Sequence, residues 1–457
     1  MIADLKPFAE YKESGLPWLG AVPAHWGLVP NRGLVRKKKK LVGKFHADFR
    51  LLSLTKLGVI VRDISTGKGK FSSDMGTSQE VRSGDLVFCL FDVPETPRTV
   101  GLSRYDGMIT GAYTVFEHSS KGNPEYFEIF YRAMDDRKLL SPLYSGLRNT
   151  IQVGRFLGTK TPQPPPDEQA AIVRFLDWAN GRLERAIRAK RKVIALLNEQ
   201  KQAIIHRAVT RGLDPNVPLR PSGIPWLGDI PQHWEVRRAK YVFREVDQRS
   251  VDGREIHLAM SQRLGLVPSS QVSSSLRSQS YAGGKLCQAG DLILNRLKAH
   301  LGVFAMARQT GVISPDYTVF RSLRPTIVEY FESVLRSPGC RRELRIRAKG
   351  IVEGFWRLYT DDFYDIRLPV PPFEEQGHIV SGMLEATASL NATISRLERE
   401  IELFREYRTR LVTDVVTGKL DVRDAATRLP DEAMVESGVD DSDLTDETEA
   451  ADEEVEA

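Results

Sequence analysis

Two long segments of the chain carry apolar residues every three or four positions, which is the spacing of one face of an α-helix. In the second segment the stripe is regular over eleven positions: Ile379, Met383, Ala386, Leu390, Ile394, Leu397, Ile401, Phe404, Tyr407, Leu411 and Val415. The first segment follows the same spacing more loosely: Ile172, Phe175, Ala179, Leu183, Ile187, Ile194, Leu197, Ile204 and Ala208. Helices of about 40 residues are roughly 60 Å long, and one alone would leave its stripe in water. We therefore expect the two to pack on each other as an antiparallel coiled coil, since the chain returns through a globular part between them.

Each helix is expected to begin directly after a proline-rich motif. Residues 164–169 read PPPDEQ, and residues 371–376 read PPFEEQ. Proline readily precedes a helix but does not fit inside one. The acidic residues that follow lie in the first turn, where the helix dipole favours negative charge. Four residues are thus candidates for a role at the helix start or in docking a partner: Glu168, Gln169, Glu375 and Gln376.

The remaining parts of the chain have the pattern of short strands. Residues 86–91 and 113–116 are rich in β-branched and aromatic side chains, and so are residues 292–294 and 317–320. Gly, Pro and Ser interrupt these pieces, as is typical of strands joined by turns. Two globular parts with strands, each followed by a long helix, predict a mixed α+β fold.

An internal repeat relates the two halves of the chain. Residues 14–26 (SGLPWLGAVPAHW) and 222–234 (SGIPWLGDIPQHW) are identical at nine of thirteen positions. Further matching pairs follow in the same order, at offsets between 204 and 208, and they include GDLV at 84–87 with GDLI at 290–293. The sequence diverges between these landmarks. One unit of about 207 residues is used twice, and the shared scaffold carries two different surfaces.

The repeat predicts two similar domains joined and spaced by the antiparallel helices, with a pseudo-twofold relation between the halves. The expected boundaries are domain 1 at 1–166, the first long helix at 167–212, domain 2 at 213–370, the second long helix at 371–421 and an acidic disordered tail at 422–457. Residues 18, 26, 226 and 234 are the duplicated tryptophans, and their identical recurrence favours a structural role. The same argument applies to His25 and His233.

Charge changes this picture once the tail is set aside. The whole chain has a formal net charge of +5, from 65 basic and 60 acidic residues. Residues 431–457 hold 13 acidic residues and no Lys or Arg, so residues 1–430 have a net charge of +18. A body this basic favours a polyanionic partner.

Several classes of protein are disfavoured. The three cysteines are scattered, without disulfide or metal-site spacing, which favours a reducing cytosol. The first residues lack the apolar stretch of a signal peptide, and no apolar run approaches the ~20 residues of a membrane span. Residues 154–161 have the wrong spacing for a phosphate-binding loop, and residues 314–317 lack the second proline of an amino-methyltransferase motif. No nuclease-like carboxylate cluster or His/Cys metal set is found in the sequence.

The duplicated SG[LI]PWLG-x-[VI]P-x-HW block, the GDL[VI] strand and the PP-x-[DE]EQ helix entry resemble the DNA-specificity (S) subunit of type I restriction-modification systems. The resemblance covers about residues 11–421. It implies that the two domains are target recognition domains, each reading one half of a gapped DNA site. It also implies that the helices space the halves and dock two methyltransferase subunits, joined by restriction (motor) subunits. S-adenosylmethionine, ATP and Mg²⁺ are then expected in those partners, and no cofactor or metal in this chain.

Candidate DNA contacts lie in basic and amide-rich stretches between the landmarks. The run 36–40 (RKKKK) suits phosphate contact, whereas the loops after the GDL strands and before the exit strands offer Arg and Asn, which pair with guanine and adenine. The candidates are Arg36, Lys37, Lys38, Arg98, Arg148, Asn149, Asn295, Arg296, Lys298, His300 and Lys349. Two other functions stay open: a stand-alone nuclease or methyltransferase with its own recognition domains, and a coiled-coil adaptor that binds only proteins.

Overall fold

In the computed structural model of the chain, the described residues are 5–62, 75–96, 98–119, 122–261, 264–272, 281–350 and 356–430. They divide into two compact units. The first unit comprises the described residues up to Lys190 together with those from Arg399 onward, and the second comprises those from Arg191 to Glu398. Each long helix thus contributes one segment to each unit.

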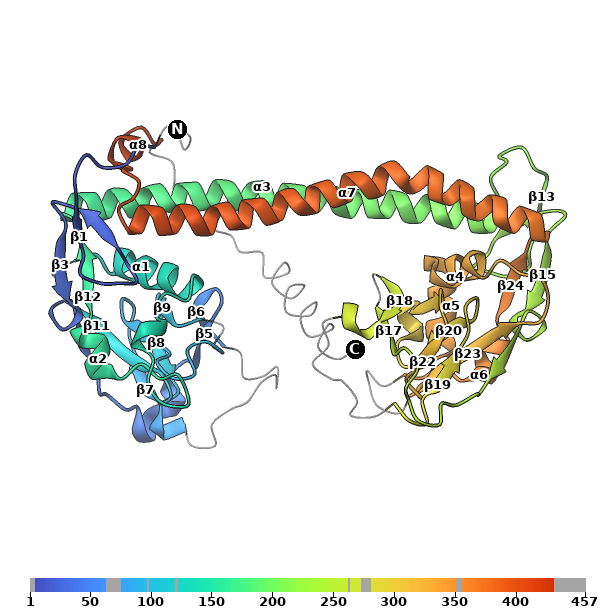
Figure 1. Cartoon of the computed structure of the whole chain (residues 1–457), viewed down its shortest axis with the longest axis horizontal. Helices are drawn as coiled ribbons and strands as arrows, with labels where there is room; N and C mark the ends of the chain where they lie inside the picture. Colours follow the sequence, from blue (N-terminus) through green and yellow to red (C-terminus); the bar gives the residue numbers. More distant parts are fainter. Residues whose placement is uncertain are drawn as a thin grey trace. The chain divides into compact units, whose positions relative to one another are not determined.

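The first unit is built around a four-stranded antiparallel sheet with the strand order β4-β11-β8-β9 (Figure 1). These strands are β4 (Val35–Lys37), β11 (Thr114–His118), β8 (Leu86–Phe88) and β9 (Val100–Leu102). Val115 pairs with Val87 at its centre, and both are fully buried. Four two-stranded pairs complete the unit: β1 (Tyr11–Glu13) with β2 (Ala21–Pro23), β3 (Gly27–Pro30) with β12 (Lys160–Gln163), β5 (Leu52–Thr55) with β6 (Gly58–Val61), and β7 (Gln79–Val81) with β10 (Gly107–Ile109).

The second unit repeats this topology strand for strand. Its four-stranded sheet has the order β16-β23-β20-β21, with β16 (Phe243–Val246), β23 (Tyr317–Ser322), β20 (Leu292–Asn295) and β21 (Phe304–Met306). The two-stranded pairs also recur: β13 (Leu219–Pro221) with β14 (Asp229–Pro231), β15 (Glu235–Arg238) with β24 (Arg367–Val370), β17 (Leu258–Ser261) with β18 (Gly265–Pro268), and β19 (Lys285–Cys287) with β22 (Gly311–Ile313). The repeated sequence therefore folds into a repeated sheet order, and the mixed α and β content is as predicted.

The short helices differ more than the strands. In the first unit, α1 (Pro124–Asp136) follows β11 and α2 (Val153–Gly158) precedes β12. In the second unit, α4 (Val328–Arg336) takes the place of α1, and a further helix, α5 (Pro338–Arg347), follows it directly. The helix before β24 is α6 (Thr360–Tyr364).

The two long helices are α3 (Pro166–Arg211) and α7 (Phe373–Val416). α3 begins and ends within one residue of its predicted bounds, whereas α7 begins two residues later and ends five residues earlier than 371–421. Pro371 and Pro372 remain in the extended chain that leads from β24, and the helix stops before Gly418. Both helices are followed by a glycine at φ +76°, Gly212 and Gly418. This left-handed conformation is the usual way for a helix to end, because glycine adopts it without strain.

Segments of α3 and α7 run antiparallel within each unit (Figure 1). In the first unit, Glu184 pairs with Arg408, and Lys190 pairs with Glu400. In the second unit, the Lys201 ammonium donates to the Asn391 side-chain oxygen at 2.7 Å. In the first unit, the residue numbers of the two pairs rise on α3 as they fall on α7. The predicted stripe on α7 is wrong at two positions, because Ala386 and Tyr407 are exposed while Thr387 is buried.

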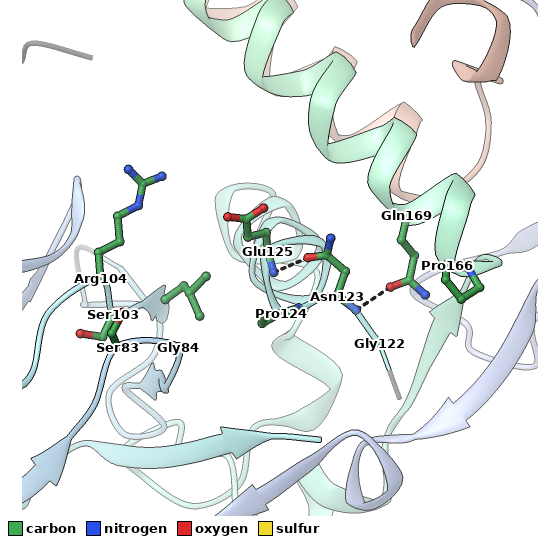
Figure 2. A pocket seen from close by; sticks show the side chains of 11 residues that line it. Ser83, Gly84, Ser103, Arg104, Gly122, Asn123, Pro124, Glu125, Pro166 and Gln169 are labelled. Atoms are coloured by element: carbon green, nitrogen blue, oxygen red, sulfur yellow. Dashed lines mark hydrogen bonds between the residues drawn. The ribbon is translucent and has the colours of Figure 1, made fainter. Parts of the chain in front are cut away.

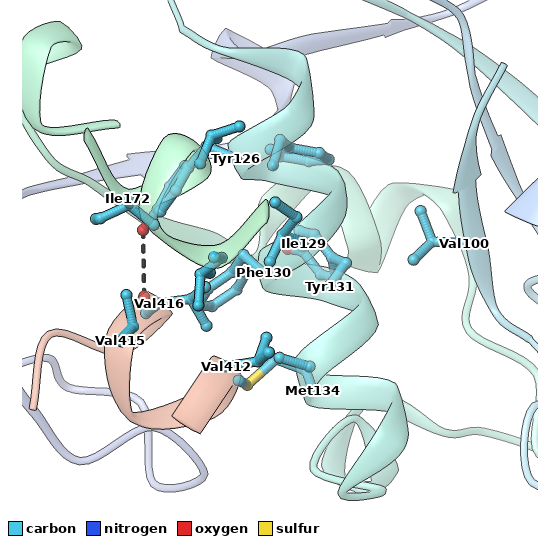
Figure 3. Close-up of a cluster of buried hydrophobic side chains, with 14 of the residues drawn as sticks. Val100, Tyr126, Ile129, Phe130, Tyr131, Met134, Ile172, Val412, Val415 and Val416 are labelled. Atoms are coloured by element: carbon cyan, nitrogen blue, oxygen red, sulfur yellow. Dashed lines mark hydrogen bonds between the residues drawn. The ribbon is translucent and has the colours of Figure 1, made fainter. Parts of the chain in front are cut away.

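The core of the first unit combines three parts of the chain. Aromatic residues of α1, including Tyr126, Phe130 and Tyr131, pack with Ile172 of α3 and with Val412, Val415 and Val416 of α7 (Figure 3). Beyond α7, the chain adds α8 (Arg423–Thr427) to this core.

The predicted start of the acidic tail at residue 422 is wrong for the described residues 422–430. Val422, Ala425, Ala426 and Leu429 are buried in the first unit's core. The backbone N–H of Asp421 donates to the carbonyl of Lys6 at 2.8 Å, which joins the two ends of the described chain. These four residues are apolar at helical spacing, and burial of their side chains stabilises the segment. Residues 431–457 lie outside the described residues.

Candidate nucleic-acid interface

The residues that recur identically in the two copies hold each domain to the start of its own long helix. In the first unit, Glu168 is buried in the first turn of α3, where its carboxylate accepts hydrogen bonds from the Trp26 indole and the His25 ring, both at 2.8 Å. In the second unit, Glu375 accepts from Trp234 at 3.0 Å and from His233 at 2.8 Å. The structural role predicted for these tryptophans and histidines is confirmed.

The glutamines next to these glutamates make a second duplicated anchor. Gln169 accepts a hydrogen bond from the backbone N–H of Asn123 at 2.8 Å and donates to the Pro164 carbonyl at 2.8 Å. Gln376 accepts from the Ile327 N–H at 3.0 Å and donates to the Pro371 carbonyl at 2.9 Å. Both side chains are buried. Figure 2 shows Gln169 beside Asn123 at the edge of a pocket of about 750 Å³.

A duplicated tyrosine fastens each domain to the end of the other long helix. The Tyr126 hydroxyl donates to the carbonyl of Val416 at the last residue of α7, at 3.2 Å (Figure 3). The Tyr330 hydroxyl donates to the carbonyl of Val209, near the end of α3, at 3.0 Å. Burial, aided by the Glu168 carboxylate, raises the pKa of Tyr126 well above its usual value. Burial and Glu375 raise the pKa of Tyr330 in the same way, so both phenols remain donors.

These anchors place Glu168, Gln169, Glu375 and Gln376 in the first turn or immediately beside it, as predicted for a role at the helix start. Docking of a partner by these residues stays a prediction.

In the first unit, two predicted DNA-contact loops lie against each other. A two-way backbone bridge between Ser145 and Thr150 closes residues 146–149 into a short loop. The Asp92 N–H donates to the Arg148 carbonyl at 2.9 Å, which joins this loop to the one after β8. Asp92 and Asn149 have positive φ values of +45° and +43°, a strained conformation for residues other than glycine. Arg148 and Asn149 are exposed at the tip of the closed loop.

Arg98 is the other candidate in the first unit's loop pair. Its side chain is largely buried, whereas Arg148 and Asn149 are exposed. The Arg98 guanidinium donates to Asp136 at 2.6 Å and to the carbonyl of Lys56 at 3.1 Å, and the side chain is 14% exposed. These bonds hold residues 98–99 to the end of α1, together with a bond from the Thr99 N–H to Asp135 at 2.9 Å. Of the first unit's loop candidates, Arg148 and Asn149 are thus the more exposed.

The second unit brings together the equivalent loops. Lys349 and Arg357 form the same two-way backbone bridge, and the Leu358 N–H donates to the Arg296 carbonyl at 3.1 Å. The Asn295 side chain accepts from the N–H groups of Leu297 and Lys298 at 3.1 and 3.3 Å, which fixes the turn after β20. The Asn295 side-chain oxygen is therefore hydrogen-bonded to the backbone of its own turn in this structure. The loop closed by the bridge includes residues 351–355, which lie outside the described residues.

The basic candidates of these second-unit loops have different surroundings. Arg296 donates to the Asp316 carbonyl at 2.8 Å, and Lys349 is paired with Asp362 at 2.7 Å while its side chain stays 67% exposed. Lys298 is partly exposed. The side chain of His300 lies outside the part that the structure describes. The backbone bridges bring Arg296 and Lys349 to one region of the second unit.

The basic run 36–40 begins in β4, at the edge of the first unit's main sheet, and continues beyond its end. Its alternate residues are neutralised by carboxylates from other parts of the unit: Arg36 by Glu117, Lys38 by Asp85 and Lys40 by Glu80, each at 2.6 Å. Lys37 and Lys39 are exposed. The run therefore supplies less net charge for phosphates than its composition indicated, with Lys37 the candidate least engaged.

The aspartate of the GDL[VI] motif has the same structural role in both units. The Asp85 carboxylate accepts from the Arg82 N–H at 2.7 Å and so closes the turn before β8. In the second unit, Asp291 accepts from the Gln288 N–H at 2.8 Å. Its charged partner there is Arg321, which binds both carboxylate oxygens at 2.8 Å. The motif is thus structural in both units.

Sequence analysis missed a basic surface on α5 of the second unit. Arg341, Arg342 and Arg345 are exposed on this ten-residue helix. The signal was present as RRELRIR at 341–347. The repeat does not reveal this run, because the run has no counterpart in the first copy.

The described residues lack the features of a metal site and of a membrane span. Within them, no group of three or more His, Cys, Asp or Glu residues could hold a metal ion, and no helix is long and apolar enough to cross a membrane. The three cysteines are buried free thiols. Burial raises the pKa of both Cys89 and Cys287 to about 11, so neither is a ready nucleophile.

No family model and no curated relative matches the sequence. Solved structures do match it. They include an HsdS subunit from Thermoanaerobacter tengcongensis (TM-score 0.42, 16% identity, 87% of this chain and 98% of that chain) and a type I restriction-modification S subunit from M. genitalium (0.33, 11%, 86% and 96%). A chain from a structure on complex assembly and conformational transition of the type I R-M system matches with a TM-score of 0.59 at 14% identity, over 86% of this chain and 98% of that chain. This chain therefore shares the fold of a protein from a type I R-M structure.

Proposed function

We propose that this protein is a non-catalytic DNA-specificity subunit of a type I restriction-modification complex, acting on double-stranded DNA in the cytoplasm. The observation that carries the proposal is the loop pair that recurs in both units on the same scaffold with different side chains. The first unit offers Arg148 and Asn149, and the second offers Arg296 and Lys349. The shared fold and the net charge of +18 over residues 1–430 support it.

In this proposal each unit reads one half of a bipartite, gapped target. Base readout requires side chains that differ between the two readers, whereas their framework can be the same. α3 and α7 would space the two halves as a coiled coil. The antiparallel contacts within each unit, Glu184 with Arg408 and Lys201 with Asn391, support this role of the helices.

The chemistry would belong to partner subunits. Two adenine methyltransferase subunits would bind S-adenosylmethionine, and restriction (motor) subunits would use ATP and Mg²⁺. The resemblance of the repeated motifs to specificity subunits is the support for these partners.

Co-expression with the methyltransferase subunits, followed by genome-wide mapping of methylated adenines, tests the proposal. We expect one motif with two specific parts separated by a gap of fixed length. Replacing residues 1–165 by those of another specificity subunit should change only one part, since each unit has its own loop pair. A change in both parts would contradict the division of labour.

Two further measurements separate the proposal from its rivals. The purified chain alone should neither methylate nor cut DNA, and activity of either kind would indicate a stand-alone enzyme. The logarithm of its affinity for duplex DNA should fall steeply with the logarithm of salt concentration, because phosphate contacts release counterions. A flat response would favour a protein-binding adaptor.

A further inference from the structure

The second unit has a basic helix that the first unit lacks. Residues 336–349, which include α5, hold six basic residues and one acidic residue. The equivalent residues of the first copy, 132–145 at an offset of 204, hold three basic and two acidic residues. The two copies thus differ by four charges in one short segment, from +1 to +5.

Ion pairing does not remove this difference. In the first unit, Arg132 pairs with Glu128 at 3.4 Å and Lys138 with Asp135 at 3.3 Å. In the second unit, Arg336 pairs with Glu332 at 2.9 Å, Arg347 with Glu343 at 2.7 Å and Lys349 with Asp362 at 2.7 Å. Arg341, Arg342 and Arg345 are exposed, and no carboxylate among the described residues lies within 4.0 Å of their guanidinium groups.

Arg341 and Arg345 lie one helical turn apart and therefore share a face of α5. This helix packs against the 3₁₀ turn η8 (Ala299–Leu301), which directly follows the loop after β20. The contact is close, because a Cβ at Gly302 would lie 2.8 Å from the Cγ of Arg341. Gly302, at φ +75°, therefore lets the aliphatic stem of Arg341 rest on the turn.

Arg345 is joined to the same loop pair from the other side. Its guanidinium lies over the Trp356 ring, 5.5 Å from the ring centroid, a cation–π contact that orients the group. Two residues further on, the Leu358 N–H bonds to the Arg296 carbonyl at 3.1 Å. The exposed face of α5 is thus continuous with the loops assigned to base readout.

We propose that Arg341 and Arg345 bind the sugar–phosphate backbone of the DNA beside the half-site read by the second unit, a contact without counterpart in the first unit. The inference rests on the proposed function. Arginine suits this task because its planar guanidinium binds phosphate oxygens in pairs. Phosphate contacts strengthen binding to every sequence and set the register of the protein, but do not select bases. The second unit would therefore hold the backbone at a place where the first unit lacks this pair of arginines.

The test is the salt dependence of binding to a short duplex of arbitrary sequence, measured with the full chain by fluorescence anisotropy. The Arg341→Ala, Arg345→Ala double variant should bind more weakly, because two phosphates are no longer neutralised. Its slope of log affinity against log salt should be smaller by about two, or about one for each of these phosphates. The Arg341→Lys, Arg345→Lys variant keeps both charges and should retain most of the slope.

The matched control is Arg137→Ala, since Arg137 occupies the position equivalent to Arg341 at an offset of 204 and is exposed at the end of α1. Its slope should equal that of the unmodified chain. Thermal unfolding of each variant separates weaker phosphate binding from damage to the fold, because Arg345 in the last turn of α5 also interacts favourably with the helix dipole.

The outcomes are distinct. If the unmodified chain shows no salt-dependent binding to the duplex, the proposed function itself fails. If it binds with a steep slope that the folded double alanine variant shares, or if Arg137→Ala also lowers the slope by about one, the inference about α5 is overturned alone. Tighter DNA binding by the double alanine variant would also overturn it, and would point to a role of these arginines in holding an acidic protein segment.

Discussion

The two units use the same residues to hold their domains to the long helices and different residues where their loops meet. Trp26 and Trp234 contact equivalent glutamates, and Tyr126 and Tyr330 reach the ends of opposite helices. By contrast, the loop closed by Ser145 and Thr150 is shorter than the one closed by Lys349 and Arg357. Identity between the copies therefore marks framework, and divergence marks the surfaces with which the units can differ in recognition.

Some framework contacts keep their function while exchanging their partners. The aspartate of the GDL[VI] motif closes the same turn in both units, yet it is neutralised by Lys38, directly after β4, in one and by Arg321 from β23 in the other. A buried carboxylate requires a positive partner wherever one can be supplied. The sheet can thus tolerate the loss of a matched residue if a neighbouring strand provides the charge.

The tryptophan anchors should show the largest effect if the frameworks are truly equivalent. Trp26→Ala and Trp234→Ala each empty a fully enclosed site and leave a glutamate without its indole donor. We expect each to lower the free energy of unfolding of its unit by about 3–5 kcal/mol, measured by urea denaturation with limited proteolysis to identify the affected unit. Trp18→Ala and Trp226→Ala are controls with smaller expected losses, since both side chains are half-buried. Equal losses at all four positions would contradict this assignment.

Substitution of the two glycines that end the long helices should have unequal effects on the stability of the two units. Gly212→Ala and Gly418→Ala both place a Cβ at φ +76°, which costs about 1–2 kcal/mol. At Gly418 this Cβ would lie only 2.3 Å from Pro23 Cδ, whereas at Gly212 the nearest atom, in Trp234, is at 3.4 Å. Overpacking should bring the loss for Gly418→Ala to about 3 kcal/mol. Thermal unfolding of the two variants compares them directly, and a larger loss at Gly212 would show that the packing argument is wrong.

Substitution of the two tyrosine anchors should have equal and smaller effects on the stability of the two units. Tyr126→Phe and Tyr330→Phe each remove one hydroxyl and leave a helix carbonyl without its donor. Each should lower the unfolding free energy by about 1 kcal/mol, with both rings still packed. Chemical denaturation measures this, with Tyr105→Phe, on an exposed residue, as the control. A large difference between the two variants would mean that one bond is not equivalent to the other.

The smallest effect concerns the glutamates at equivalent positions of α1 and α4. Burial, partly opposed by Arg132, raises the pKa of Glu128. Its folded form therefore retains the proton more tightly than the unfolded chain, and this contribution is present below the usual pKa of glutamate and lost as pH rises through the raised value. Glu128→Gln should remove that loss, so the stability of the first unit should fall less in this variant than in the unmodified chain as pH rises above the usual pKa of glutamate.

Glu332→Gln is the matched variant for this comparison. Glu332 pairs with Arg336 at 2.9 Å and accepts the Met306 N–H at 3.0 Å. The substitution weakens this pair and should lower stability at neutral pH. Thermal unfolding across the pH range distinguishes the two variants, and the same sign of change at pH 7 would rule out this explanation.

The sequence was sufficient for the parts of the fold that depend on local pattern. The prolines and acidic residues before α3 predict where it begins, and the paired landmarks predict that both units share one topology. Residues 422–430 were missed because four apolar side chains are too few to stand out beside an acidic segment. The antiparallel contacts of α3 and α7 follow from their stripes, but the exposure of Tyr407 depends on which residues face it.

The candidate site was predicted less completely, since its geometry depends on residues far apart in the chain. Arg148 and the loop after β8 meet through one backbone bond across more than fifty residues, for which no periodicity exists. The carboxylates that neutralise Lys38 and Lys40 come from other parts of the unit, so the run alone overstated its free charge. The arginines of α5 are evident in the sequence, but the sequence does not show that Arg341 packs on Gly302 and Arg345 on Trp356.

The composition of the first unit has a consequence for how the chain folds during synthesis. Its core needs Leu411, Val415 and Leu429, which leave the ribosome more than two hundred residues after α1. Among the described residues, the main core cluster of the second unit draws on residues between Ile205 and Met383, a continuous stretch. Closing the longer loop costs more entropy and delays non-local contacts. We therefore expect the second unit to complete first, while the apolar surface of the first waits for the end of α7 and for α8, and is the place where a chaperone would bind.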